Sequence, residues 1–388
     1  MSERPTVAHV MPEYLSRTAT YIYNTVSLQE RYAPVVLTEA LAHLDEYPLD
    51  APIVQLPAAT SRSLRSRLAG FRNDYEQAIS REVGERGCAL IHGHHGWSGR
   101  FAARAAIRNG VPLVTTYYGR DLSMKKRRSE LRPPYHQLFA HGARFICEGP
   151  AMGEHLVRLG CPRDRIRLVK IGIEIDKFPF EPRRRERPLI FMLAARFMEK
   201  KGFDLTVRAF AEALPRLGPS ELWLVGDGEL RQDLEDLVDR LGVRGSVRFL
   251  GSVSYAEYQD VIRRAHVCVQ PSRVASDGDT EGGAPTVLLE MQATGVPIVG
   301  TTHADIPYVV HDRQFLVPEE DVAGLADALE RIAAISDDEY RARLEDARAF
   351  VEREHDVRLM ASSVEAVYAE ALGAESHQPV RRLETAHV

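Results

Sequence analysis

Short apolar runs that end near Gly, Pro, Asn or Asp alternate with longer segments of helical periodicity along most of this chain. In the first half, the strand candidates are residues 6–12, 33–38, 89–95, 111–118 and 143–149, and the apolar segment 165–175 ends this half. In the second half they are residues 189–195, 222–228, 247–253, 266–272 and 296–302. Because parallel strands need crossover connections, this alternation predicts parallel sheets of the α/β class.

Residues 176–188, DKFPFEPRRRERP, interrupt the alternation with prolines and a run of charge, which is typical of a linker. A chain of 388 residues is long enough to form two domains, each with its own core. We therefore expect one doubly wound domain over residues 1–180 and a second over residues 181–360. The polar residues 376–388 are expected to form a disordered tail.

Composition limits the classes of function. The chain is 44% apolar with a net charge of -5, so no general attraction to nucleic acid is expected. Its four cysteines lie far apart without a C-x-x-C pair and read as buried thiols of a reducing cytosol. No apolar run reaches the length that spans a bilayer. We expect a cytoplasmic protein, with peripheral contact at the inner membrane face left open.

The stretch Thr280–Gly300, TEGGAPTVLLEMQATGVPIVG, predicts an anion-binding helix start. Pro285 suits the first helical position and Gly295 the C-terminal cap, so a helix is expected over residues 285–294. The glycines before it let a phosphate approach backbone N–H groups at the positive end of the helix dipole. Glu290 lies inside this apolar helix and needs hydroxyl or cationic partners if it is buried. A capped core helix is the alternative, but it leaves Glu290 unexplained.

This stretch resembles the signature of retaining family 4 glycosyltransferases, E-G-x-G-x-x-x-L-E followed by a helix and a strand. In that family the first Glu contacts the donor sugar, the second contacts the nucleotide ribose, and the loop between them holds the diphosphate. The resemblance implies these roles for Glu281, for Glu290, and for the loop Gly282, Gly283, Ala284, Pro285 and Thr286. Here eight residues separate the two acids where the family usually has seven, so the loop must absorb one more residue.

Other segments of the second half fit the same resemblance. LAARFMEKKGFDL, residues 193–205, resembles the family's segment whose Arg and Lys hold the donor diphosphate, which implies that role for Arg196 and Lys201. Fixed cations there would stabilise the charge of the leaving diphosphate. Surface charge is the alternative reading of both residues. The turn at Gly226 and the backbone at Gly251 match positions near the bound nucleotide, although both glycines also suit simple turns.

The first half carries weaker matches. IHGHHGWSGRFAA (91–103) and TTYYGRDLS (115–123) resemble family segments that reach the bound sugars, which implies acceptor or donor-sugar contacts for Tyr118, His94, His95 and Asp121. Tyr118 stands where many members have a histidine. Both histidines also suit a satisfied core. The segment 11–26 matches the loop that shapes the acceptor pocket and offers Arg17 and Thr18. Usual ligand spacings do not assemble a zinc site from HGHH.

Two basic runs, residues 125–132 and 183–187, read as solvated faces, with attraction to an anionic lipid-linked acceptor as the alternative for the first.

The resemblance implies the GT-B fold, two facing Rossmann-like domains with a cleft between them, and a helix over residues 361–375 that crosses back to the first domain. It implies a metal-independent enzyme without cofactor that transfers a hexose or N-acetylhexosamine, with retention, from a nucleotide sugar. A UDP-sugar is expected as donor, and a glycan, lipid-linked or small-molecule hydroxyl as acceptor. A sugar-nucleotide epimerase or phosphorylase of the same fold, and a noncatalytic nucleotide-sugar-binding protein, remain as alternatives. The oligomeric state stays open.

Overall fold

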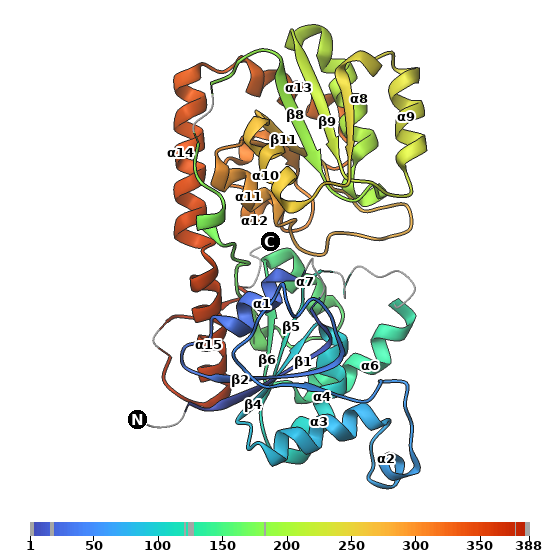
Figure 1. The fold of residues 1–388 in the computed structure, drawn as a ribbon, viewed down its shortest axis with the longest axis vertical. Helices are drawn as coiled ribbons and strands as arrows, with labels where there is room; N and C mark the ends of the chain where they lie inside the picture. Colours follow the sequence, from blue (N-terminus) through green and yellow to red (C-terminus); the bar gives the residue numbers. More distant parts are fainter. Residues whose placement is uncertain are drawn as a thin grey trace. The chain divides into compact units, whose positions relative to one another are not determined.

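The computed structural model describes residues 4–15, 19–119, 122, 128–181, 184–376 and 378–384. The chain forms two compact units, Met1–Gly172 with Val357–Val388 and Ile173–Asp356. Each unit has helices on both faces of a sheet whose strands are parallel, apart from one short edge strand in the first unit (Figure 1). The predicted α/β class and the two doubly wound units are therefore confirmed.

The sheet of the first unit has the order β14-β7-β6-β5-β4-β1-β2-β3. Its strands are β1 (Thr6–Tyr14), β2 (Ala33–Leu41), β3 (Ile53–Gln55), β4 (Leu90–His94), β5 (Leu113–Thr116), β6 (Arg144–Cys147), β7 (Ile166–Leu168) and β14 (Arg381–Arg382). Its helices are α1 (Thr20–Ser27), α2 (Leu64–Leu68), α3 (Asp74–Glu85), α4 (Gly96–Asn109), α6 (Arg128–His141), α7 (Pro150–Arg158), η2 (Arg163–Arg165) and α15 (Val357–Leu372). Side chains of α3 and α4 pack on one face of this sheet. Those of α1 pack on the other face, where α1 meets α15.

The sheet of the second unit has the order β10-β9-β8-β11-β12-β13 and is parallel throughout. Its strands are β8 (Leu189–Ala194), β9 (Ser220–Val225), β10 (Val247–Gly251), β11 (Val267–Gln270), β12 (Ile298–Thr301) and β13 (Leu316–Val317). Its helices are α8 (Phe203–Leu217), α9 (Arg231–Arg240), α10 (Tyr255–Arg264), α11 (Val287–Thr294), α12 (Ile306–Val309), α13 (Val322–Ala334) and α14 (Asp337–Glu354). Short 3-10 turns are η3 (Ile175–Lys177), η4 (Glu199–Lys201), η5 (Arg244–Ser246) and η6 (Arg313–Phe315).

The division between the units lies eight residues before the predicted boundary of 180/181, at Gly172/Ile173. The chain enters and leaves the second unit side by side, because Ile173 forms a parallel bridge with Asp356. The segment expected as a linker is partly held to that unit, since Arg348 donates to the carbonyl of Phe178 at 2.6 Å. The final helix, α15, begins at Val357 rather than 361 and belongs to the first unit.

The expectation of a disordered tail is wrong for residues 381–384. β14 pairs antiparallel with β7, and Leu383 is only 7% exposed in the core of the first unit. Arg163 also donates to the carbonyl of Glu384 at 3.1 Å. Strand pairing at the edge of the sheet and one buried apolar side chain hold this segment, and its polar composition did not indicate either contact.

The structure also bears on the expectations for the cysteines, for a membrane-spanning helix and for the two basic runs. All four cysteines are buried and free, as expected. Among the described residues, no helix is both long and apolar enough to cross a membrane. Of the two basic runs, residues 125–127 and 183 lie outside the described part of the chain.

Candidate active site

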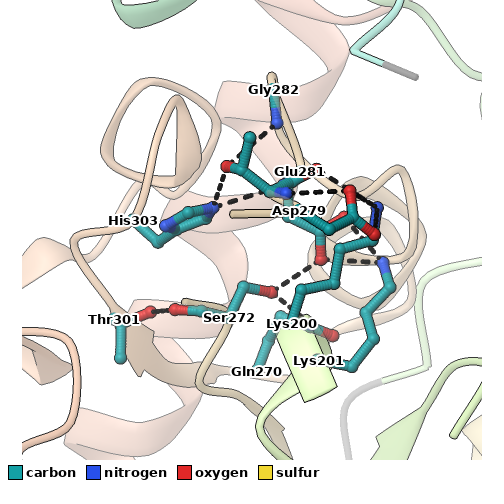
Figure 2. A network of polar contacts seen from close by, with 10 residues as sticks. Lys200, Lys201, Gln270, Ser272, Asp279, Glu281, Gly282, Thr301 and His303 are labelled. Carbon is teal, nitrogen blue, oxygen red and sulfur yellow. Dashed lines mark hydrogen bonds and ion pairs between the residues drawn. The ribbon is translucent and has the colours of Figure 1, made fainter. Parts of the chain in front are cut away.

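Two segments that the sequence marked separately lie beside each other in the second unit (Figure 2). η4 follows the carboxyl end of β8, and the loop of residues 271–286 follows the carboxyl end of its neighbour β11. The helix expected over residues 285–294 is α11, which begins two residues later than expected, at Val287, so that Pro285 precedes it. It ends at Thr294, and Gly295 follows in the left-handed conformation. Open parallel sheets bind ligands at this edge.

Lys201 and Glu281 form a shielded ion pair. The Nζ of Lys201 lies 2.8 Å from the Oε1 of Glu281, and the two side chains are 17% and 8% exposed. Ser272 donates from its hydroxyl to the same carboxylate at 2.8 Å. Burial would raise the pKa of Glu281, but Lys201, supported by Lys200 and Ser272, holds it below its ordinary value. The carboxylate is thus ionised and fixed in orientation.

Lys200, which was not among the predicted site residues, binds the loop of residues 271–286 at two further points. Its Nζ lies 3.2 Å from a carboxylate oxygen of Asp279 and donates to the carbonyl of Thr280 at 3.1 Å. Two lysines therefore face two acids in residues 279–281, so that their charges cancel. The adjacent pair of lysines in the sequence was the signal that a second cation belongs to the site.

Arg273 fastens the start of the loop to η4. Its guanidinium donates to the carbonyl of Glu199 at 3.1 Å and to Asp204 at 2.9 Å. It also contacts both carboxylate oxygens of Glu320, at 3.1 and 3.0 Å. The Glu199 carboxylate in turn accepts from the backbone and hydroxyl of Ser276, each at 2.7 Å. These contacts hold the loop after β11 against η4, the turn that carries Lys201.

His303 supports the backbone at Glu281. Its Nε2 lies 3.3 Å from the backbone N of Glu281 and 2.8 Å from the hydroxyl of Thr280. Because a backbone N–H can only donate, this Nε2 is an acceptor. The ring hydrogen is then on Nδ1, which lies 2.8 Å from the carboxylate of Glu319. His303 follows β12, and no local pattern around it indicated this role.

The start of α11 presents unused backbone donors. Within the described chain, no protein acceptor receives the N–H groups of Gly283, Ala284, Thr286 and Val287. Gly282 has φ +75°, which favours glycine and lets the loop turn toward the helix. Free N–H groups at a helix N-terminus bind anions. These residues are the ones expected to hold a diphosphate.

Glu290 points from α11 toward α10. The hydroxyl of Tyr258 donates to its Oε2 at 2.6 Å. Burial raises the pKa of Glu290 above its ordinary value, and the hydrogen bond from Tyr258 opposes that change. The predicted hydroxyl partner thus exists, although it comes from the protein. The other lone pairs of this carboxylate remain suited to further hydroxyl donors.

The remaining predicted residues of this unit differ in role. Arg196 is exposed, and its guanidinium has no polar protein partner among the described residues. A Cβ at Gly226 would lie 1.9 Å from the carbonyl oxygen of Ala195, so this glycine is required by close packing of two turns. The N–H of Gly226 donates to the carbonyl of Gly251 at 2.8 Å. Gly251 itself has φ +69° and faces open space.

The predicted residues of the first unit are partly described. His94 at the end of β4 contacts the hydroxyl of Tyr118 through its Nδ1 at 2.8 Å. His95 is buried, and its ring stacks on Trp97 with centroids 4.5 Å apart. Arg17, Thr18 and Asp121 lie outside the described residues.

A histidine cluster that the sequence analysis missed surrounds His94. His9 of β1 and His92 of β4 lie beside it, and the ligand atoms of the three lie within 4.8 Å of one another. The strand register puts His9 opposite His92, which alternation in IHGH alone could not reveal. Such a group could hold a metal ion, but its ring nitrogens already have hydrogen-bond partners in the protein.

Two family models match the chain. Residues 187–334 match glycosyl transferases group 1, and residues 18–177 match glycosyltransferase family 4. The chain is 28% identical over 274 residues to WcaL of Escherichia coli strain K12, named as a colanic acid biosynthesis glycosyltransferase. It is 30% identical over 246 residues to the amylovoran biosynthesis glycosyltransferase AmsK of Erwinia amylovora. These alignments cover 69% and 62% of this chain, and 67% and 60% of the two relatives.

Solved structures share the whole architecture. HepE of Anabaena, in complex with UDP and glucose, has a TM-score of 0.75 and 15% identity over 95% of this chain and all of its own. Sucrose-phosphate synthase from Thermosynechococcus elongatus has a TM-score of 0.74 and 18% identity over 96% of this chain and 100% of its own. These similarities show the GT-B fold. With both units matched by family models, the chain belongs to glycosyltransferase family 4 and is a glycosyltransferase.

Proposed function

We propose that this protein transfers a hexosyl or N-acetylhexosaminyl group from a nucleotide sugar, with retention of configuration, to a hydroxyl of a glycan or lipid-linked acceptor. The observation that carries the proposal is the loop of residues 279–286. It combines an ionised, oriented acid at Glu281 with unused N–H groups at the start of α11. Such a loop suits a ligand that carries both sugar hydroxyls and a diphosphate.

The ion pairs of the site indicate which residues contact the diphosphate and which contact the sugars. Lys201 is neutralised by Glu281 before any ligand binds, whereas Arg196 is exposed and has no polar partner within the described chain. Arg196 and the helix amides therefore offer most of the net positive charge for the diphosphate. Glu281 accepts hydrogen bonds from the donor sugar, and Glu290 accepts them from the ribose beside Tyr258.

Retention follows from a reaction on one face of the sugar. The bond between the anomeric carbon and the leaving diphosphate oxygen breaks, and the acceptor oxygen bonds to the same face. The acceptor proton passes to the leaving diphosphate, whose developing charge is stabilised by Arg196 and the amides of residues 283–287. No metal ion or cofactor takes part in this scheme. Glu281 positions the sugar and forms no covalent intermediate.

The donor and acceptor are proposed by analogy. HepE of Anabaena was crystallised in complex with UDP and glucose and with UDP-glucose, which favours a UDP-sugar here. WcaL and AmsK are named for the biosynthesis of colanic acid and of amylovoran, which favours a glycan or lipid-linked acceptor. A small-molecule acceptor is the less favoured alternative.

The test is a donor screen followed by turnover. UDP- and GDP-sugars are added to the purified protein with EDTA, and thermal unfolding identifies donors, because a bound ligand raises the midpoint. Each donor is then incubated in radiolabelled form with lipid extracts and oligosaccharides. A glycosidic product with the donor's anomeric configuration, or slow donor hydrolysis, supports the proposal. Epimerised nucleotide sugar, phosphorolysis, or binding without turnover would point to the alternatives. Glu281→Gln serves as the inactive control.

A further inference from the structure

The short helix α2 of the first unit exposes its apolar side chains and buries a polar one. Leu64 is 68% exposed and Leu68 is 81% exposed, whereas Ser66 is fully buried. An ordinary surface helix turns its apolar residues toward the core and its polar residues toward water. Figure 1 shows α2 on a loop that projects past α3. The two leucines therefore contribute little to the core of this unit.

The helical repeat gathers these leucines between two cations. Successive residues of an α-helix are about 100° apart around its axis, so Leu68 lies only about 40° from Leu64. Arg65 then lies about 100° to one side of Leu64, and Arg67 lies about 60° to the other. Ser66 is on the opposite side. The exposed face of α2 thus has an apolar centre with an arginine on each flank.

Polar contacts fix the start of α2. Ser63 is its N-cap, and the hydroxyl of Ser63 accepts from the N–H of Ser66 at 3.2 Å. The Ser66 hydroxyl donates to the carbonyl of Ser63 at 2.9 Å. The carboxylate of Asp74, in the first turn of α3, accepts from the hydroxyl and from the backbone N–H of Ser63. The start of α2 is therefore bound to the start of α3.

Two arginines of α4 hold the other end of α2. Arg108 donates to the carbonyl of Ala69 at 2.6 Å, and Arg104 donates to the carbonyl of Gly70. The guanidinium of Arg108 also lies over the buried ring of Phe71, 5.0 Å from its centroid. Because both ends of α2 are held, the exposure of its leucines is a feature of the fold and not the result of a frayed segment.

The charge around the leucines is entirely positive. Residues 56–72 contain four arginines and neither Asp nor Glu, in a chain whose net charge is -5. The side chains of Arg62, Arg65 and Arg67 are exposed, and within the described part of the chain their guanidinium groups have no polar protein partner. These cations are therefore available to an anionic surface.

A groove of about 350 Å³ adjoins the end of α2. It is lined by Arg104, Ile107 and Arg108 of α4 and by His141 of α6. Each guanidinium carries five N–H donors, so Arg104 and Arg108 keep donors beyond those used on backbone carbonyls. The side chain of Ile107 is 54% exposed beside them. Cationic donors next to apolar surface suit the phosphate of a lipid headgroup.

We propose that the first unit docks on an anionic phospholipid bilayer through the α2 surface, which consists of Arg62, Leu64, Arg65, Arg67 and Leu68. Both leucines enter the boundary between headgroups and acyl chains, and the arginines contact lipid phosphates around them. An exposed apolar patch bordered by cations is what an interfacial helix offers to an anionic membrane. This docking requires neither donor nor acceptor and does not depend on the proposed function.

An acidic protein would also attract the arginines, but it fits the leucines less well. Side chains that anchor protein interfaces fill well-packed, desolvated pockets, and Leu is under-represented among them. The α2 surface projects and carries no aromatic side chain, since the nearby Phe71 is buried. A fluid bilayer can surround a projecting apolar tip without a preformed pocket.

The direct test is binding of the full-length protein to lipid vesicles without donor or acceptor. Vesicles of equal parts phosphatidylglycerol and phosphatidylcholine should bind at least about tenfold more tightly than vesicles of phosphatidylcholine alone, because each arginine near an anionic surface adds to the attraction. Added salt should weaken this binding, since it screens surface charge. Equal binding to both kinds of vesicle, or none to either, would overturn the docking.

The leucines are tested by Leu64→Ser combined with Leu68→Ser. Because both side chains are exposed, the variant should fold like wild type, and its partition to anionic vesicles should fall at least about tenfold. The matched control is Leu241→Ser combined with Leu359→Ser, at leucines exposed by 38% and 40% on α9 and α15, and it should bind like wild type. Undiminished binding of the folded α2 variant would contradict insertion.

The arginines are tested by Arg65→Ser combined with Arg67→Ser. Partition to anionic vesicles should fall by about fivefold for each arginine removed. Arg240→Ser combined with Arg341→Ser removes the same charge from exposed positions of α9 and α14 and should have little effect. An equal loss in both double variants would mean that net charge alone attracts the protein, without a specific surface.

A fluorescent label reports whether α2 enters the bilayer. All four native cysteines are buried, so Leu68→Cys provides one exposed thiol for an environment-sensitive nitrobenzoxadiazole label. Its emission should shift to the blue with anionic vesicles and stay unchanged with soluble polyglutamate. The same label at Leu241→Cys should respond to neither. A shift with polyglutamate but not with vesicles would assign the surface to an acidic protein and overturn membrane docking.

Discussion

The ammonium of Lys201 lies 2.8 Å from the carboxylate of Glu281, although eighty positions separate the two residues in the chain. The pair joins the two segments that the family resemblance assigns to the diphosphate and to the donor sugar. Lys201 therefore has a structural partner before it has a ligand. Its first effect is to keep Glu281 ionised and in place.

Breaking this pair from one side should destabilise the second unit. Lys201→Met removes the cation in contact with the buried Glu281 carboxylate, which keeps only the hydroxyl of Ser272 and the more distant charge of Lys200. We expect the free energy of unfolding to fall by about 3 kcal/mol in urea denaturation. Lys201→Met with Glu281→Gln should recover most of that loss, because no charge remains. Because the pKa of Glu281 is lowered, the pair's contribution is present above the ordinary pKa and is lost as pH falls below it. The difference between wild type and Lys201→Met should therefore shrink below about pH 4. Simple additivity of the two substitutions would argue against the coupling.

Arg196→Ala should separate function from stability. Its guanidinium has no polar partner within the described chain, so unfolding should change by no more than about 0.5 kcal/mol. Loss of a charge-stabilising donor should lower kcat/KM by roughly 100-fold. Arg240→Ala, at an exposed position of α9, is the matched control and should leave turnover intact. Equal turnover for both variants would remove Arg196 from the proposed diphosphate site.

Glu290→Gln should weaken donor binding while it stabilises the free protein at neutral pH. A charged acceptor is lost from the ribose contact, which should raise the donor Kd by about tenfold or more in calorimetry. The pKa of Glu290 is raised in the fold, so its ionisation destabilises the protein as pH rises through that pKa. The variant should accordingly gain more thermal stability over wild type at pH 7 than at pH 4. Glu345→Gln, exposed on α14, should do neither. Unchanged donor affinity in Glu290→Gln would contradict the ribose assignment.

Gly202→Ala should be costly because the turn after η4 excludes a side chain. Gly202 has φ +67°, and a Cβ there would lie 2.1 Å from the carbonyl oxygen of Pro271. We expect a loss of at least about 2 kcal/mol in unfolding free energy. Gly245 has no atom within 4 Å of a built Cβ, so Gly245→Ala should be close to neutral. Similar stabilities for the two variants would mean that η4 can move away from Pro271.

Leu383→Ala tests the anchored C-terminal segment. Leu383 is buried in the core of the first unit, so its truncation should cost about 2–3 kcal/mol in chemical denaturation. The neighbouring exposed Glu384→Ala should have little effect. A neutral Leu383→Ala would restore the interpretation of residues 381–384 as a disordered tail.

The sequence was informative where the signal is local. Hydrophobic periodicity located most strands of both sheets, and Pro285 with Gly295 located α11, because these preferences act within a few residues. It missed β3, β13 and β14, which have only three, two and two residues. Strands this short carry no periodicity, and they form because a neighbouring edge offers hydrogen-bonding groups.

The candidate site shows the same limit. Motifs identified Glu281, Lys201 and Arg196 as site residues, but they did not indicate which of the two cations forms an ion pair with the acid. Lys201 is paired and Arg196 is not because the loop after β11 folds onto η4 of the neighbouring strand β8. Arg273 and His303 take part in that arrangement from positions that no motif marked.

By itself, then, the sequence determined the fold class, the two doubly wound units and the loop that precedes α11. Only the tertiary structure decided that Lys201 meets Glu281, that His9 lies opposite His92, and that the hydroxyl of Tyr368 in α15 lies 2.5 Å from the Nδ1 of His92. The physical reason is that periodicity and backbone preference act along the chain, whereas strand order and register bring together side chains far apart in it.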